Sequence, residues 1–154
     1  MIKQIPNPQI FIDPGLKWIL HEGEPQTEHY KNFNTLHYQV FDFALPYVEN
    51  FAKKHFKKYM CSIIKQEPGH VIPLHTDKYF YFSNKTYKCN PDDIVRFAIF
   101  LEDWQSGHYF ELANKPIVNW KKGQYVELNN RLPHRSGNIG DTTKYTAQIT
   151  GLLK

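Results

Sequence analysis

The chain has 154 residues, 19 Lys and Arg against 15 Asp and Glu, and a high aromatic content of 11 Phe, 10 Tyr and 3 Trp. This length predicts one domain, and the apolar content is too high for intrinsic disorder. The net charge of +4 does not indicate nucleic-acid binding, no apolar run is long enough for a membrane span, and two cysteines are too few for a disulfide framework or a four-ligand zinc site.

The single domain is expected to span 1–154, with the first 58 residues supporting the rest. The start of the chain lacks the apolar run of a secretion signal, which predicts a cytoplasmic protein. Short strands are predicted at Gln9–Ile12 and Lys17–Leu20. A helix is predicted over Leu45–Lys58, because apolar residues recur there at spacings of three and four and Lys residues crowd its C-terminal half.

From Tyr59 onward the apolar pattern has a period of two, which is typical of strands. Turn residues interrupt it at intervals near ten residues, and this favours a sandwich, jelly roll or barrel with its core in 59–153. A long polar and aromatic loop is predicted at Lys78–Asp93. The predicted strands are Met60–Gln66, Val71–Asp77, Ile94–Glu102, His108–Leu112, Tyr125–Leu128 and Lys144–Leu153.

His75 and Asp77 alternate on one of these strands, so both side chains project from the same face, with Cα atoms about 6.6 Å apart. Such a pair also occurs as a surface His beside a turn Asp, and a second histidine strengthens the metal-binding interpretation. His134 follows a separate strand. Two His and one carboxylate form the facial triad that binds Fe(II) and leaves three coordination positions open.

Lys144 opens the last predicted strand, ten residues after His134. Lys144, Thr146 and Gln148 alternate there with apolar residues, so a polar face carrying a cation is predicted on one side of the strand. A cation on an interior strand needs an anion. The distal carboxylate of 2-oxoglutarate would supply one.

Four segments, in this order, resemble the Fe(II)/2-oxoglutarate-dependent oxygenases, and most closely their prolyl 4-hydroxylase-like branch. The resemblance covers about residues 59–153, and the ordered set is more specific than any one motif. The segments are Ile63–His70 leading to His75-Thr76-Asp77, Phe97–Trp104 with Gly107 and Phe110-Glu111, Trp120–Leu128, and His134 followed by Lys144.

The resemblance implies a mainly β fold, a double-stranded β-helix (jelly roll, cupin-like) with a supporting N-terminal helix. It implies that His75, Asp77 and His134 bind Fe(II), that Lys144 pairs with the C5 carboxylate of 2-oxoglutarate, and that Thr146 donates its hydroxyl to the same carboxylate. Gln66 stands where this branch usually has Tyr, and its amide would contact the cosubstrate. O₂ is the implied second cosubstrate, with ascorbate as an accessory reductant.

The activity implied by the resemblance is hydroxylation of an unactivated C–H bond, with release of succinate and CO₂. The implied substrate is a protein or peptide residue, with prolyl as the first guess, or a free amino acid. Nucleic acid is less favoured, because Thr150 stands where the nucleic-acid-repair branch has a second Arg. His108 and Asn138 also depart from the prolyl hydroxylase pattern. No membrane partner is expected.

The alternative is a non-catalytic cupin-like module that holds a metal or small ligand, although such a module has no need of the Lys144 and Thr146 pair. Candidate substrate contacts are Tyr79 and Tyr81, Arg96 and Trp104. The aromatic loop could equally be ordinary packing over the barrel mouth, Arg96 could lie at the surface of a strand end, and Trp104 could fill the core.

Overall fold

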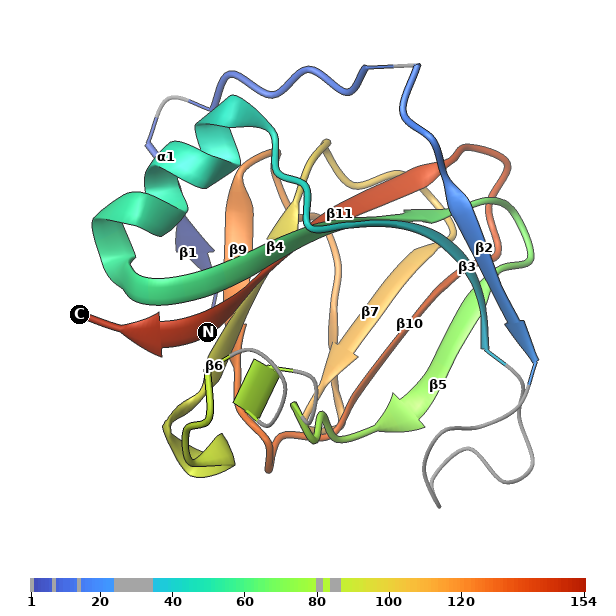
Figure 1. Cartoon of the computed structure of the whole chain (residues 1–154). Helices are drawn as coiled ribbons and strands as arrows, with labels where there is room; N and C mark the ends of the chain where they lie inside the picture. The colour runs from blue at the N-terminus through green and yellow to red at the C-terminus, as the bar shows by residue number, and fades with distance from the viewer. Residues whose placement is uncertain (1, 7, 14, 24–34, 80–81, 84–86) are drawn as a thin grey trace.

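The structure, a computed structural model, describes residues 2–6, 8–13, 15–23, 35–79, 82–83 and 87–154. This part of the chain is mainly β with one α-helix, as the sequence predicted. The strands form a single curled antiparallel sheet (Figure 1). They are β1 Lys3–Gln4, β2 Ile19–Gly23, β3 Thr35–Phe41, β4 Phe56–Gln66, β5 Val71–His75, β6 Val95–Phe100, β7 His108–Leu112, β8 Lys115–Ile117, β9 Gln124–Leu128, β10 His134–Asn138 and β11 Lys144–Leu153.

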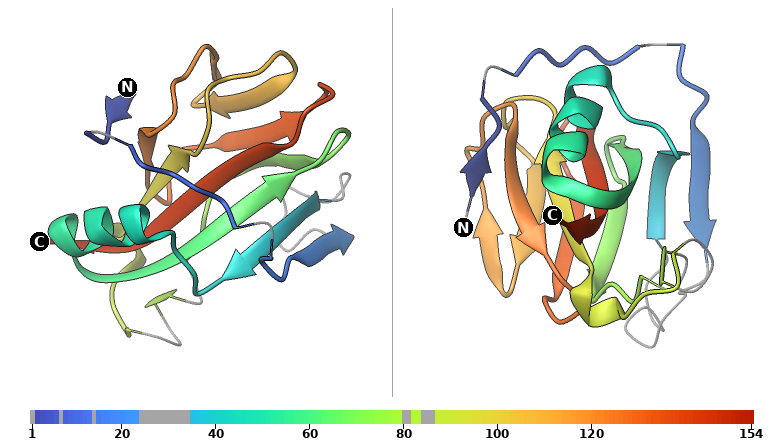
Figure 2. Two further views of the ribbon diagram at one scale, coloured as in Figure 1. Left: turned by 90° about the horizontal axis from the view of Figure 1, so that it is seen from above. Right: turned by 60° about the vertical axis from the view of Figure 1, so that its left-hand side comes forward.

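Neighbouring strands in the sheet are mostly distant in sequence, in the order β1-β9-β6-β11-β4-β3-β5-β10-β7-β8, with β2 paired to β3. The longest pairing joins β4 and β11, which run side by side through the molecule (Figure 2). The strands β5, β10, β7 and β8 therefore form one half of the curl and the long strands form the other. Most of the strand pairs join segments that are far apart in the sequence, so the fold depends on non-local pairing.

The helix α1 spans Pro46–His55 and is shorter than predicted. It ends because Phe56 is extended (φ −115°, ψ 139°) and begins β4, which pairs with the end of β11. Phe56 is 2% exposed, and its ring packs against Phe97. Strand pairing and burial thus override the helical periodicity of residues 56–58. In the described part of the chain, no helix has the length and apolar character needed to cross a bilayer.

The N-terminal segments contribute strands to the same sheet. The strand predicted at Lys17–Leu20 is observed slightly later, as β2. The strand predicted at Gln9–Ile12 is wrong: these residues have no regular structure, and Ile10 and Ile12 pack against the core beneath α1 instead. The strands β1, β3, β8 and β10 were not predicted. Two of them, β1 and β8, are only two and three residues long, and β10 has little β-forming composition. The β-forming residues of β3 were overlooked.

The last strand, β11, separates the main core from the interior of the barrel. Its odd-numbered residues Ala147 and Ile149 lie in the apolar cluster under α1, with Ile63 of β4 and Phe97 of β6. Its even-numbered residues face the opposite side. The predicted alternation of a polar and an apolar face is confirmed on this strand.

Phe97 connects α1 to the sheet and supports a stability prediction. Its ring contacts those of Phe51, Phe56 and Tyr125, and it is 3% exposed. We expect Phe97→Ala to lower the free energy of unfolding by about 3–5 kcal/mol, because it removes a large buried ring and leaves a cavity. Denaturant unfolding followed by circular dichroism measures this, with Ile139→Ala, at a residue 84% exposed, as the control. Equal stabilities would contradict the assigned core.

Candidate metal centre

The residues His75, Asp77 and His134 come together between two neighbouring strands. His75 ends β5 and His134 begins β10, and the two are paired across the sheet. Asp77 lies two residues beyond the end of β5. One ligand atom from each side chain lies within 4.8 Å of the other two. The Nε2 atoms of His75 and His134 are 3.4 and 3.5 Å from the carboxylate oxygens of Asp77.

Backbone carbonyls fix the orientation of both imidazole rings. His75 Nδ1 lies 2.8 Å from the carbonyl oxygen of Pro73, and His134 Nδ1 lies 3.0 Å from that of Leu132. A donating Nδ1–H leaves Nε2 unprotonated, and in both rings Nε2 faces Asp77. Burial lowers the pKa of His134 to about 4, so this ring is neutral near pH 7. Metal-binding histidines in proteins have this arrangement.

The Asp77 carboxylate is ionised and only 10% exposed. Burial alone would raise its pKa, but the adjacent Arg96 guanidinium opposes burial and holds the pKa below its usual value. Its Oδ2 atom is 3.0 Å from Arg96 Nη1 without hydrogen-bond geometry. Among the described residues Oδ2 has no hydrogen-bond partner, and the two carboxylate oxygens each face one imidazole nitrogen, an arrangement that fits a bound divalent cation.

The residues Lys144, Gln66 and Thr146 form a second cluster on the interior face of β4 and β11. Lys144 is 2% exposed, and its Nζ donates to Gln66 Oε1 at 2.8 Å and to Thr146 Oγ1 at 3.5 Å. Among the described residues, no carboxylate forms an ion pair with this ammonium group. A buried cation solvated only by neutral oxygens is a ready site for an anion. The cluster therefore fits the distal carboxylate of 2-oxoglutarate.

Two further side chains, which the sequence analysis did not assign to the site, support this cluster. Gln66 Nε2 donates to Ser136 Oγ at 3.2 Å. Asn138 is fully buried, and its amide donates to the backbone carbonyls of Gln66 and Thr142. Ser136 lies two residues beyond His134, and this spacing on a strand could have indicated it. Asn138 thus ties β4 to the turn before β11, on the side of the site where Lys144 lies.

The charge of Lys144 depends on what occupies the cluster. Burial lowers the pKa of its ammonium group to about 7, and nearby Glu102 offsets only part of this. At about pH 8 the side chain is mostly neutral without ligand, and a bound carboxylate favours the ammonium form. We therefore expect 2-oxoglutarate binding to take up protons at about pH 8 and not at about pH 6.

Calorimetry in buffers of different ionisation enthalpy measures this uptake. Lys144→Arg keeps its charge at both pH values, so it should bind without uptake. If the binding enthalpy of the wild-type protein at about pH 8 is the same in all buffers, no proton is taken up, and the assignment of Lys144 is contradicted.

The candidate substrate contacts fall into two groups. Arg96 is only 20% exposed: its Nη1 pairs with Asp77, its Nε donates to Thr150 Oγ1 at 2.8 Å, and it lies over the ring of Tyr79. Arg96 and Tyr79 therefore lie beside the candidate metal centre, and Arg96 is not a freely exposed residue. Trp104 instead packs against the apolar cluster around Phe100, and its Nε1 donates to a backbone carbonyl. Tyr81 lies outside the described residues.

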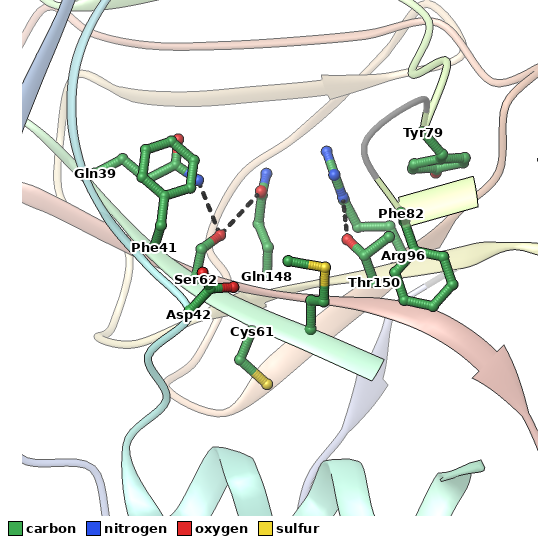
Figure 3. Close-up of a pocket in the computed structure, with 11 residues that line it drawn as sticks. Gln39, Phe41, Asp42, Cys61, Ser62, Tyr79, Phe82, Arg96, Gln148 and Thr150 are labelled. Atoms are coloured by element: carbon green, nitrogen blue, oxygen red, sulfur yellow. Dashed lines mark hydrogen bonds between the residues drawn. The ribbon is translucent and has the colours of Figure 1, made fainter. Parts of the chain in front are cut away.

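A cavity of about 470 Å³ opens beside Arg96 and Tyr79. Figure 3 shows Arg96, Gln148 and Thr150 extending into it from the sheet, with Tyr79 and Phe82 on one side and Gln39 and Phe41 on the other. The volume is within the range of small-molecule sites. It is lined by Gln39, Phe41, Asp42, Met60, Cys61, Ser62, Tyr79, Phe82, Arg96, Gln148 and Thr150.

Solved structures share this architecture. An oxidoreductase of the 2OG-Fe(II) oxygenase family from Burkholderia pseudomallei superposes with a TM-score of 0.56 and 13% identity, over 89% of this chain and 74% of that one. A viral collagen prolyl hydroxylase of Paramecium Bursaria Chlorella virus-1, solved as a 2OG complex, gives a TM-score of 0.53 and 16% identity, over 75% and 79%.

The chain has a cupin-like fold. KdgF from Halomonas sp. also shares it, with a TM-score of 0.51 and 9% identity over 96% of both chains. No family model matches the sequence, and no curated protein matches it. At these identities the likeness establishes the fold, and the predicted jelly roll with its supporting helix is confirmed. The chemistry must be argued from the side chains.

Proposed function

We propose that this protein is an Fe(II)- and 2-oxoglutarate-dependent dioxygenase that hydroxylates an unactivated C–H bond. The observation that carries the proposal is the pairing of two sites on one barrel interior. One is the triad of His75, Asp77 and His134, and the other is the buried Lys144 without a carboxylate partner among the described residues. A barrel that only binds a metal gains nothing from a buried, destabilising ammonium group.

One set of side chains would bind the metal and another would bind the cosubstrate. The two Nε2 atoms and the Asp77 carboxylate would hold Fe(II), and Lys144, Thr146 and Gln66 would hold the C5 carboxylate of 2-oxoglutarate. Bound Fe(II) would supply the O₂ chemistry, in which one oxygen atom enters the substrate, the other enters succinate, and CO₂ is released. The carbonyls of Pro73 and Leu132 keep the imidazoles aimed at the metal.

The substrate is proposed to be a protein or peptide residue, prolyl included, or a free amino acid. The cavity beside Arg96 is where it would bind, since Arg96 contacts Asp77 at one end and lines the cavity at the other. Burial of the triad keeps bulk water away from the reacting atoms.

Turnover of 2-oxoglutarate without substrate tests the proposal. We expect purified protein with Fe(II), O₂ and 2-oxoglutarate to form succinate slowly, and His134→Ala to form none above the background of metal in buffer. The matched control is His55→Ala, a histidine at the end of α1 and outside the triad. Equal succinate formation by wild type and His134→Ala would exclude the proposed centre.

A further inference from the structure

The cavity beside the metal centre has unused hydrogen-bond donors at one end. Arg96 uses Nε for Thr150 and Nη1 for Asp77, which leaves Nη2 without a partner among the described residues. Gln148 accepts from Ser62 through Oε1, and its Nε2 donates to no group in the described part of the chain. This end of the cavity is therefore rich in donors, and an occupant must present acceptors.

The two donors lie close together on the sheet. Arg96 on β6 is paired with Thr150 of β11, and Gln148 is two residues before Thr150 on the same face. Such diagonal neighbours are within reach of each other when the side chains are long. Figure 3 shows both side chains extending in the same direction from the sheet into the cavity. A planar group with two oxygens could accept from both.

The end of the cavity at Arg96 and Gln148 favours an anion when the metal site is filled. Among the described residues, the carboxylate that balances Arg96 is that of Asp77. A divalent cation on the Asp77 carboxylate would take up that negative charge and leave the guanidinium without its own counter-ion. Asp42, the remaining charged residue among those lining the cavity, is exposed and lies at the far side, beside Phe41 (Figure 3).

Apart from Gln39, Ser62 and Thr150, whose side chains hydrogen-bond to other residues of the lining, the remainder of the lining is apolar. Phe41 lies on one side of the cavity and Tyr79 and Phe82 lie on the other (Figure 3), and Met60 also contributes to the lining. Tyr79 and Phe82 are 6% and 3% exposed, so these walls are fixed by packing. The cavity thus suits a molecule with an apolar body and one acidic end.

We infer that the cavity binds a small apolar carboxylic acid, with its carboxylate on Arg96 and Gln148 and its apolar body among Phe41, Met60 and Phe82. This inference rests on the proposed function and narrows its substrate to a free acid in place of a residue within a chain. Because Arg96 also contacts Asp77, the carbons next to the carboxylate lie nearest the metal. Oxidation is therefore directed to that end of the molecule.

Binding of paired acid and amide probes tests the inference. The probes are 4-methylpentanoate and 3-phenylpropanoate, each compared with its primary amide, and titrated by calorimetry into protein loaded with Mn(II) and saturating 2-oxoglutarate. Saturation keeps the acids away from Lys144. We expect each acid to bind roughly tenfold more tightly than its amide, because its hydrogen bonds are charge-assisted.

Variants of Gln148 locate the binding. Gln148→Glu should weaken acid binding by roughly tenfold or more and leave amide binding within about twofold, since it replaces a donor with a like charge. Gln148→Met, which removes the donors without adding charge, should weaken acid binding less. The control is Arg135→Gln, which removes a guanidinium that pairs with Glu111 and is 48% exposed.

Three results would overturn the inference: equal affinity for acid and amide, preference for the amide, or no acid binding at millimolar concentration. Tighter binding of the amides would indicate a residue within a peptide. Binding of 2-oxoglutarate, measured first in the same protein, separates the two proposals. If 2-oxoglutarate binds and the acids do not, the inference fails and the proposed oxygenase stands. If 2-oxoglutarate does not bind, the proposed function itself fails.

Discussion

Asp77→Ala is expected to lower the affinity for Fe(II) by about a hundredfold or more. The substitution removes the anionic ligand and leaves two neutral imidazoles, and mutation of outer partners alone typically costs about 10- to 100-fold in metal affinity. It also leaves the Arg96 guanidinium without its counter-ion. Anaerobic calorimetry with Fe(II) measures the affinity, and circular dichroism verifies that the variant is folded.

The control for Asp77→Ala is Asp92→Ala. Asp92 also pairs with an arginine, Arg131, at 3.3 Å, but both side chains are exposed. Loss of a surface ion pair has little effect on stability and should leave metal binding unchanged. An unchanged Fe(II) affinity in folded Asp77→Ala would remove this residue from the metal site.

Lys144→Ala is expected to lower the affinity for 2-oxoglutarate by roughly a hundredfold while Fe(II) binding is kept. The ammonium is fully buried, so its pairing with the C5 carboxylate is not screened by solvent, and truncating one partner of such a pair is costly. Titration of the metal-loaded protein with 2-oxoglutarate measures the loss. Lys65→Ala is the matched control, since Lys65 is adjacent to Gln66 on β4 but pairs with Glu67.

The stability of a Lys144 variant provides a second readout. Without 2-oxoglutarate, Lys144→Met should raise the free energy of unfolding by about 1 kcal/mol, because a buried ammonium without an anion is replaced by an apolar side chain. A residue that destabilises the free protein and strengthens cosubstrate binding is functional and not structural. Lower stability together with unchanged 2-oxoglutarate affinity would show that Lys144 serves only packing.

Much of the sheet could be predicted because its signals are local. The alternation of Lys144, Thr146 and Gln148 with apolar residues requires no knowledge of neighbouring strands, and β7 and β11 begin and end where the sequence predicted. The spacing of His75 and Asp77 is a local signal too. The resemblance implied that His134 joins them at one metal, but the pairing of β5 with β10 that brings it there was not predicted.

The rest depends on contacts between distant segments. The end of α1 is set by the pairing of Phe56 with Leu153 in β11, far along the chain. Arg96 could have been a surface residue on its sequence alone, and it is only partly exposed because Asp77 and Thr150 both lie against it. The amide donors of Gln148 indicate a carboxylate site only because Arg96 lies beside them. Such juxtapositions arise from topology, and one sequence does not display them.

Anaerobic titration of the folded protein with Fe(II) and then 2-oxoglutarate tests the central claim most directly. A weak visible charge-transfer band should appear only when both are present, because 2-oxoglutarate must then chelate the metal. The band should be absent in Asp77→Ala, and in Lys144→Ala it should require roughly a hundredfold more 2-oxoglutarate. Folded wild-type protein that gives no band with both components would contradict the proposal that these two clusters form an oxygenase site.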